Sequence, residues 1–384
     1  MQNWNSQLFS KGAAAAGVSP SIIASANAYA RRIISCNSDL PIVFTLKHFA
    51  HLTELPFDNL VKIVERKEDP YRSFLIKKRS RPGDRAVARR YRTICIPDTT
   101  LMFAQRWIDQ KILSKVDPHN CSTAFHGNSS IVRAAQRHCG CRWLIKIDIQ
   151  RFFESITESS VCRVFQSLGY PDLLSFELGR LCTREPSVLS RRWKFRRTRS
   201  YPSGVHQHPS IGFLPQGSPT SPRLANLTMR EFDEGVNSIS RSYGLVYSRY
   251  ADDLIFSTDA ATFSRVEAEA LISRIYQVLL EYGFEPNRTK TMISPPRARK
   301  IVLGLLVDRD TPKLTRQFKQ DLENHVFYLS HPRHGPSQHA NKRNFTSVIG
   351  LQNYVQGLLA HAAQVDSAFA DRMRAMLAQV KWPI

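Results

Sequence analysis

The tetrapeptide Tyr250-Ala-Asp-Asp253 sets two adjacent carboxylates between two short apolar runs, and it constrains the fold more than any other feature of the chain. The flanking runs, residues 244–250 and 254–257, predict a β-hairpin with the acids at its tip. Two carboxylates in a tight turn repel each other unless a cation neutralises them, and Mg²⁺ prefers such hard oxygen ligands. The tip therefore indicates a metal site, although an Asp-Asp pair alone is more often a solvated turn.

A third acid, Asp148, lies within a run of β-branched and apolar residues at 144–149. The run predicts a mostly buried strand, in which an aspartate costs free energy unless it is paired or binds a metal. Asp148 and Asp252 together could hold two Mg²⁺ ions about 4 Å apart, one activating an attacking hydroxyl and one stabilising a leaving pyrophosphate. This is the chemistry of nucleotidyl transfer.

Five blocks of the sequence resemble, in the same order, the conserved blocks of the reverse transcriptases, and more closely those of the bacterial retron type. The blocks are residues 91–97 (YRTICIP), 146–156 (KIDIQRFFESI), 214–227 (LPQGSPTSPRLANL), 250–253 (YADD) and 283–290 (GFEPNRTK). The resemblance covers residues 70–308 closely and the C-terminal region loosely. Any one block could arise by chance, whereas five in sequence are specific.

The resemblance implies an α+β fold with the right-hand architecture of polymerases. We expect an N-terminal helical region at 1–60, fingers at 61–140, a palm at 141–308 with a basic insertion near 190–212, and a helical thumb at 309–384. Independently, residues 267–282 predict a helix, and Ser221-Pro222 predicts the start of another. Two C-terminal helical stripes predict core positions, namely Leu351, Tyr354, Val355, Leu358, Leu359, Phe369, Met373, Met376 and Leu377.

The resemblance also implies roles for individual residues. The catalytic set is Asp148, Asp252 and Asp253, with Lys290 able to protonate the departing pyrophosphate, and Ile149 joins the three acids in the Mg²⁺ site. Lys290 could equally be an ordinary surface charge. The residues expected to contact the deoxynucleotide are Lys78 and Arg92 at its triphosphate, Phe153 under its sugar, and Gln216 and Gly217 at the nucleotide and the template base.

The ring of Phe153 would clash with a 2′-hydroxyl, so the resemblance favours the use of deoxynucleotides. Ordinary core packing is the alternative interpretation, and for the neighbouring Phe152 it is as well supported as function. For Gln216 and Gly217 the alternative is a structural turn.

Composition indicates a nucleic-acid partner. The chain has 54 Lys and Arg against 32 Asp and Glu, a formal charge of +22, and such an excess usually faces a polyanion. One segment combines basic and aromatic residues without any acid, which fits phosphate contact and base stacking but also a solvated basic loop. The expected nucleic-acid contacts in it are Arg191, Arg192, Trp193, Lys194, Arg196, Arg197 and Arg199.

The sequence also makes predictions about location and further metals. The apolar stretches are far shorter than the ~20 residues of a membrane helix, and the N-terminus lacks the basic start of a signal peptide. Seven scattered cysteines fit a reducing compartment, so we expect a cytoplasmic protein without a membrane partner. His138, Cys139 and Cys141 form a metal-like cluster that lacks a second half, which disfavours zinc.

The expected function is therefore RNA-directed DNA synthesis with Mg²⁺ and deoxynucleotides. For a retron enzyme, the family implies a structured non-coding RNA as template and primer, priming from a 2′-hydroxyl, RNA-linked cDNA as the product, and a role in anti-phage defence with a possible effector protein. Two departures weaken the subtype: residues 157–213 contain no asparagine for the retron Asn-Ala-x-x-His element, and the Val-Thr-Gly triplet reads Val302-Leu-Gly304. Other defence-associated or group II-like reverse transcriptases are alternatives, as is a non-catalytic RNA-binding scaffold.

Overall fold

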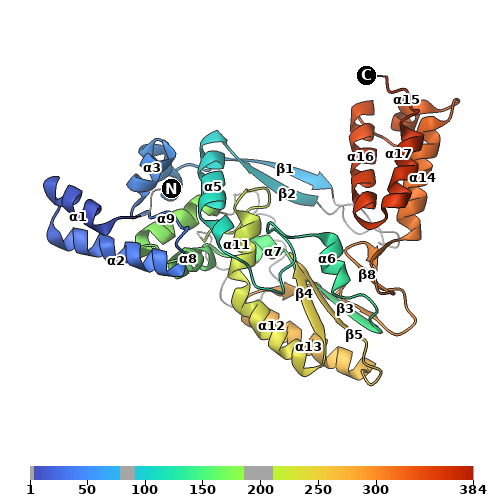
Figure 1. Cartoon of the computed structure of the whole chain (residues 1–384), viewed down its shortest axis with the longest axis horizontal. Coiled ribbons are helices and arrows are strands. Elements are labelled where there is room, and N and C mark those ends of the chain that lie inside the picture. The colour runs from blue at the N-terminus through green and yellow to red at the C-terminus, as the bar shows by residue number, and fades with distance from the viewer. Residues whose placement is uncertain (1–3, 78–90, 186–210, 384) are drawn as a thin grey trace. The chain divides into compact units, whose positions relative to one another are not determined.

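The computed structural model describes residues 4–77, 91–185 and 211–383. The chain divides into two compact units that interleave along the sequence. Figure 1 labels the helices and strands of the chain. The first unit holds residues 1–127, 149–236 and 275–287, and the second holds residues 128–148, 237–274 and 288–384. Helices α12 (Arg230–Ser242) and α13 (Arg265–Glu281) contribute residues to both, and α13 confirms the helix predicted at 267–282.

The first unit is mainly helical. Side chains cap several of its helices at their N-termini: Asn5 accepts hydrogen bonds from the backbone amides of Gln7 and Leu8, and Thr45 accepts one from that of His48. Its helices outside α12 and α13 are α1 (Ser6–Ala15), α2 (Pro20–Cys36), α3 (Leu46–Thr53), α4 (Phe57–Val64), α5 (Thr99–Lys111), the 3₁₀ helix η1 (Leu113–Lys115), α7 (Phe152–Ser155), α8 (Glu158–Ser167), α9 (Asp172–Cys182) and α11 (Ser221–Thr228).

Two further features of the first unit position candidate residues. Strands β1 (Tyr71–Lys77) and β2 (Tyr91–Pro97) form an antiparallel pair in which Tyr71 faces Pro97 and Lys77 faces Tyr91. Helix α11 begins at Ser221 with a proline in its first turn, as predicted, because proline lacks only an amide hydrogen that the first turn leaves unpaired anyway.

The second unit contains the predicted acidic strand and hairpin. Strands β4 (Val246–Tyr250), β5 (Asp253–Thr258) and β3 (Trp143–Gln150) lie side by side in that order, all antiparallel, and β7 (Met292–Ser294) pairs with β3 on its other side. Six of the eight residues of β3 are buried, as expected for a strand covered on both faces. The last two residues of β3 belong to the first unit, where they pair with β6 (Glu285–Pro286).

The rest of the second unit comprises helix α6 (Ile131–Gln136), a small three-stranded sheet and the C-terminal helices that follow this sheet. The sheet order is β10 (Lys313–Leu314), β9 (Leu305–Leu306) and β8 (Ile301–Val302). The C-terminal helices are α14 (Arg316–Ser330), α15 (Gly335–Lys342), α16 (Val348–Val365) and α17 (Ser367–Leu377). No helix in the described part of the chain is long and apolar enough to cross a membrane.

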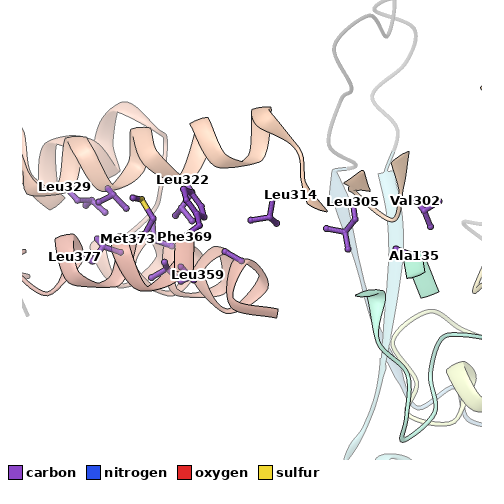
Figure 2. Packing of buried hydrophobic residues seen from close by; sticks show 14 of the residues in the cluster. Ala135, Val302, Leu305, Leu314, Leu322, Leu329, Leu359, Phe369, Met373 and Leu377 are labelled. Carbon is purple, nitrogen blue, oxygen red and sulfur yellow. The ribbon is translucent and has the colours of Figure 1, made fainter. Parts of the chain in front are cut away.

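The C-terminal helices pack around one apolar core. Figure 2 shows Leu322 and Leu329 of α14 pointing toward Phe369, Met373 and Leu377 of α17. Each such buried side chain contributes about 1.5–3 kcal/mol relative to an exposed one.

The predicted stripes are confirmed at most positions. Leu351, Val355, Leu359, Phe369, Met373 and Leu377 are buried, and Tyr354 and Leu358 pack against this core while partly buried. The prediction was wrong for Met376, whose side chain is 42% exposed. The buried positions of α17 lie on one face of the helix, at Phe369, Ala370, Met373 and Leu377, and Met376 falls at the edge of this face.

Candidate active site

A two-residue turn carries the acids of the hairpin. Strand β4 ends at Tyr250, β5 begins at Asp253, and these two residues face each other across the turn formed by Ala251 and Asp252. Ala251 has a φ of 55°, a left-handed conformation that costs a non-glycine residue about 1–3 kcal/mol. Arg249, whose side chain is fully buried, donates a hydrogen bond from Nη1 to the carbonyl oxygen of Ala251 (3.3 Å). The strained turn is thus tied to a buried cation.

Strand register brings the third acid to the hairpin. Asp148 of β3 faces Asp253 of β5 directly, and facing residues of neighbouring strands project to the same side of a sheet. Asp148 is 8% exposed, and Asp252 and Asp253 are half-buried. Burial, and after it the neighbouring carboxylates of Asp253 and Asp148, raise the pKa of Asp252 to about 6, against a smaller opposing effect of Lys290. The site concentrates negative charge in a poorly solvated place.

Lys290 lies at these acids. Its Nζ is 2.6 Å from Oδ2 of Asp148, which makes an ion pair between the loop that precedes β7 and the acidic strand. The structure therefore brings together all four residues predicted to be catalytic, within one unit.

The acids fit a divalent cation by their chemistry. Carboxylate oxygens are the ligands of hard cations, and the pKa of Asp252 is raised by burial and by the two neighbouring carboxylates, both of which a bound cation would offset. Within the described residues, no group of three or more acidic, histidine or cysteine side chains is arranged to hold an ion. Ile149 is buried and could offer only its backbone carbonyl.

His138 supports the hairpin in a way that the sequence did not predict. Its ring is buried, with Nδ1 2.7 Å from Oγ of Ser257 on β5 and Nε2 2.7 Å from Oγ of Ser248 on β4. Burial, with the nearby Arg137 charge, lowers the pKa of His138 to about 3, so the ring is neutral and joins both strands of the hairpin. With both ring nitrogens engaged, His138 does not extend toward a zinc site with Cys139 and Cys141.

In the first unit, the predicted nucleotide-binding loop packs on the strand that carries Arg92. The carbonyl oxygen of Gln216 accepts a hydrogen bond from the amide of Cys95 on β2 (2.7 Å). Gly217 has a φ of 109°, and a Cβ there would lie 2.8 Å from the carbonyl oxygen of Cys95. Only glycine fits this approach. The side chain of Gln216 donates to Oε1 of Glu154 (3.0 Å), a contact that the sequence gave no reason to expect.

The two aromatic residues after β3 differ in their surroundings. Phe152 is 3% exposed and packs against Phe284, with ring centres 6.0 Å apart, so it is a core residue. Phe153 is half-buried beside Phe152 and Phe125, at 5.4 and 6.3 Å between ring centres. Its partial exposure leaves part of the ring able to contact a ligand.

The remaining predicted contacts are only partly placed. Arg92 lies exposed on β2, opposite Ile76 of β1. Lys78 lies outside the described residues, and so does the basic segment with Arg191, Arg192, Trp193, Lys194, Arg196, Arg197 and Arg199. Their roles stay predictions.

A family match and the similar known proteins both indicate the same family. Residues 76–320, more than half of the chain, match the family described as reverse transcriptase (RNA-dependent DNA polymerase). The chain is 28% identical over 293 residues to the retron Ec86 reverse transcriptase of Escherichia coli, covering 76% of this chain and 80% of the relative.

Two relatives from Myxococcus xanthus are each 30% identical. The retron Mx162 reverse transcriptase aligns over 231 residues, covering 58% of this chain and 46% of the relative. The retron Mx65 reverse transcriptase aligns over 287 residues, covering 73% of this chain and 60% of the relative. The chain thus spans about half the length of these two relatives.

Proposed function

Because the chain belongs to the reverse transcriptase (RNA-dependent DNA polymerase) family, we propose that Asp148, Asp252 and Asp253 form its catalytic centre and bind Mg²⁺. The chain is an RNA-directed DNA polymerase of the retron type, and the family depends on divalent metal. The observation that carries the proposed site is the register of β3 and β5, which sets Asp148 opposite Asp253 and beside the turn that holds Asp252.

The side chains themselves suggest a division of labour. Asp148 and Asp253 project from neighbouring strands and give the site a fixed geometry, while Asp252 is presented by the turn that Arg249 holds. When bound, two divalent ions would activate the primer hydroxyl and stabilise the charge of the leaving pyrophosphate. The new bond joins the hydroxyl oxygen to the α-phosphorus, and the bond from that phosphorus to pyrophosphate breaks. Lys290, held at 2.6 Å from Asp148, is positioned beside the acids and can give its proton to the departing pyrophosphate.

We further propose that residues of the first unit bind the deoxynucleotide. The half-exposed Phe153 would exclude a 2′-hydroxyl, Gln216 and Gly217 would contact the nucleotide and the template base, and Arg92 with Lys78 would bind the triphosphate. The close packing of the Gly217 loop on β2 supports a fixed arrangement of this loop and the strand that carries Arg92.

The proposed partners follow from charge and family. A formal charge of +22 suits a structured non-coding RNA that serves as template and primer, with 2′-hydroxyl priming, RNA-linked cDNA, and the basic segment 191–199 among the contacts. A defence effector protein is a further proposed partner. We propose the assignment of residues 1–60, 61–140, 141–308 and 309–384 to N-terminal region, fingers, palm and thumb. All seven cysteines are unpaired, which supports the proposed cytoplasmic location.

The direct test is Asp252→Asn, with Asp259→Asn as the matched control. Both changes remove one negative charge without changing side-chain size, but Asp259 is exposed beyond the end of β5. In primer extension on an RNA template with Mg²⁺ and deoxynucleotides, we expect Asp252→Asn to abolish synthesis and Asp259→Asn to retain it, with RNA affinity nearly unchanged in both. Wild-type synthesis by Asp252→Asn would contradict the proposed site and favour a scaffold function.

A further inference from the structure

A pocket of about 290 Å³ lies among the C-terminal helices. Its lining residues include none of the residues of the acidic hairpin. Its walls are Asn324 and Tyr328 of α14, His339 and Lys342 of α15, and Arg343, which ends α15. All five side chains can donate hydrogen bonds, and two are permanently charged. The described residues that line it include no carboxylate. This lining is chemically suited to an anion.

The most buried wall residue has an unused hydrogen-bonding atom. His339 is 2% exposed, its Nε2 lies 2.9 Å from Nδ1 of His325, and its own Nδ1 is buried without a hydrogen-bond partner. A buried polar atom left in this state costs about 1–3 kcal/mol. If the Nδ1–H of His325 donates to Nε2 of His339, then the neutral His339 ring carries its proton on Nδ1, an atom that is enclosed by the protein and not open to the pocket.

The other groups of the pocket are held in place and add positive charge. The ring of Tyr328 is stacked on that of His339, with centres 5.3 Å apart and planes at 17°, and Nζ of Lys342 lies 5.3 Å from the centre of the Tyr328 ring. Burial lowers the pKa of His339 to about 4, and the charges of Arg343 and Lys342 are among the further causes. The positive charges of Arg343 and Lys342 thus disfavour protonation of His339, a residue of the pocket wall.

We infer that this pocket binds one nucleoside phosphate unit, with Lys342 and Arg343 neutralising the phosphate, the hydroxyl of Tyr328 and the amide of Asn324 donating hydrogen bonds, and the ring of His339 forming part of the wall. A phosphate accepts several such bonds, and both cations suit it. The volume is at the lower end of the ~300–1,000 Å³ of small-ligand pockets, which accommodates a phosphate with its sugar. The inference rests on the proposed function, because it takes the phosphate to be that of an RNA strand or of a free nucleotide.

The test compares two double variants that remove the same charge. Lys342→Ala with Arg343→Ala empties the pocket of cations, and Lys313→Ala with Arg316→Ala removes two exposed cations of the same unit that do not line it. Binding is measured by fluorescence anisotropy over a salt series, using a short single-stranded RNA with and without a 5′-phosphate, and with AMP and inorganic phosphate as competing ligands.

If an RNA strand supplies the phosphate, the pocket variant loses at least about tenfold in RNA affinity relative to the control variant, and its salt dependence flattens by about 0.7 log units for each lost contact. A stronger effect on the 5′-phosphorylated RNA assigns the pocket to a strand end. If a free nucleotide supplies it, only AMP and phosphate binding are lost. Equal binding of RNA, AMP and phosphate by the two double variants would overturn the inference.

Two further measurements separate ligand binding from folding. Tyr328→Phe removes one hydroxyl, so it should weaken binding severalfold at an unchanged melting temperature. In ¹⁵N-edited NMR spectra, AMP should shift the ring signals of His339 but not those of His138, which is equally buried in the same unit. Signals of His339 that do not respond to saturating AMP or RNA would count against the inference.

The test of the pocket can fail or succeed independently of the test of the proposed catalytic site. Primer extension at saturating primed template should be unchanged in the pocket variant, whereas Asp252→Asn should abolish it. If Asp252→Asn stayed active, the catalytic proposal would fail while the affinity comparison between the two double variants still decided the pocket.

Discussion

The acidic hairpin gathers three carboxylates beside Lys290, whereas the described lining of the α14–α15 pocket holds two cations and no carboxylate. At the hairpin, burial and two neighbouring carboxylates raise the pKa of Asp252 to about 6. At the pocket, burial and neighbouring basic groups lower the pKa of His339 to about 4. The excess of one sign of charge at each place suits a ligand of opposite charge, which we propose to be a divalent cation at the hairpin and a phosphate at the pocket.

The two regions are also built differently. Strand register fixes the positions of Asp148 and Asp253, and buried groups, Arg249 and His138, hold the hairpin from within the sheet. The cations of the pocket, in contrast, are exposed side chains at the end of a short helix. We therefore expect changes at the hairpin to act on catalysis and on folding, and changes at the pocket to act on affinity.

The largest expected effect distinguishes a loss of catalytic rate at the hairpin from a loss of affinity at the pocket. Asp148→Asn removes one carboxylate from the cluster and should lower the single-turnover rate of primer extension roughly 10²–10³-fold while leaving RNA affinity unchanged. Lys342→Ala should lower the affinity for the ligand of the pocket, RNA or AMP, and leave the single-turnover rate at saturating RNA unchanged. Parallel losses of rate and affinity in both variants would show that the two regions do not have distinct functions.

A smaller effect concerns the buried histidine of the hairpin. His138 has a pKa of about 3 in the folded chain and an ordinary value of 6.5, so below pH 6.5 the unfolded chain binds a proton that the folded chain excludes. Its contribution to stability is therefore complete above pH 6.5 and falls by about 1.4 kcal/mol per pH unit as the pH decreases from 6.5 toward 3.

Urea unfolding between pH 7.5 and 5 measures this contribution. We expect His138→Gln to reduce the slope of the free energy of unfolding against pH by about that amount in the acidic part of the range. Ser257→Ala, which removes one hydrogen bond but keeps His138, should leave the slope in place. Identical slopes for His138→Gln and the wild type would show that His138 is not held neutral by the sheet.

The smallest expected effect concerns the buried cation at the turn. Arg249→Lys keeps the charge but loses the guanidinium hydrogen bond to the Ala251 carbonyl, and it should lower the free energy of unfolding by about 1 kcal/mol. Because Ala251 precedes Asp252, the concentration of Mg²⁺ that gives half-maximal primer extension should also rise. Arg241→Lys, at an exposed position of α12, is the control and should change neither quantity.

The hairpin was predictable because its chemistry is local. Apolar runs around Asp252 define the two strands and the turn, and the apolar run around Asp148 defines a buried strand, so each element follows from neighbouring residues. The register that sets Asp148 opposite Asp253 follows from pairing between strands about 100 residues apart, which no local pattern specifies.

The residues that support the hairpin, and the pocket itself, could not be predicted, because both depend on contacts between residues that are far apart in the sequence. Arg249 lies beside Tyr250 in a strand and could have been an exposed alternating residue, and the serine partners of His138 lie more than 100 residues away. The pocket requires α14 and α15 to pack with His339 against His325 and Tyr328, a tertiary arrangement without a sequence motif. The exposure of Met376 likewise depends on which face of α17 the other helices cover.

The most direct test of the central claim is to measure metal binding at the acids. Mn²⁺ can replace Mg²⁺ as a paramagnetic probe, and electron paramagnetic resonance counts the ions bound to the full chain in the presence of primed RNA template and a deoxynucleotide. We expect Asp148→Asn and Asp252→Asn each to lose bound Mn²⁺, and Asp259→Asn to bind as many ions as the wild type. Equal Mn²⁺ binding by Asp252→Asn and the wild type would contradict the assignment of the hairpin as the metal site.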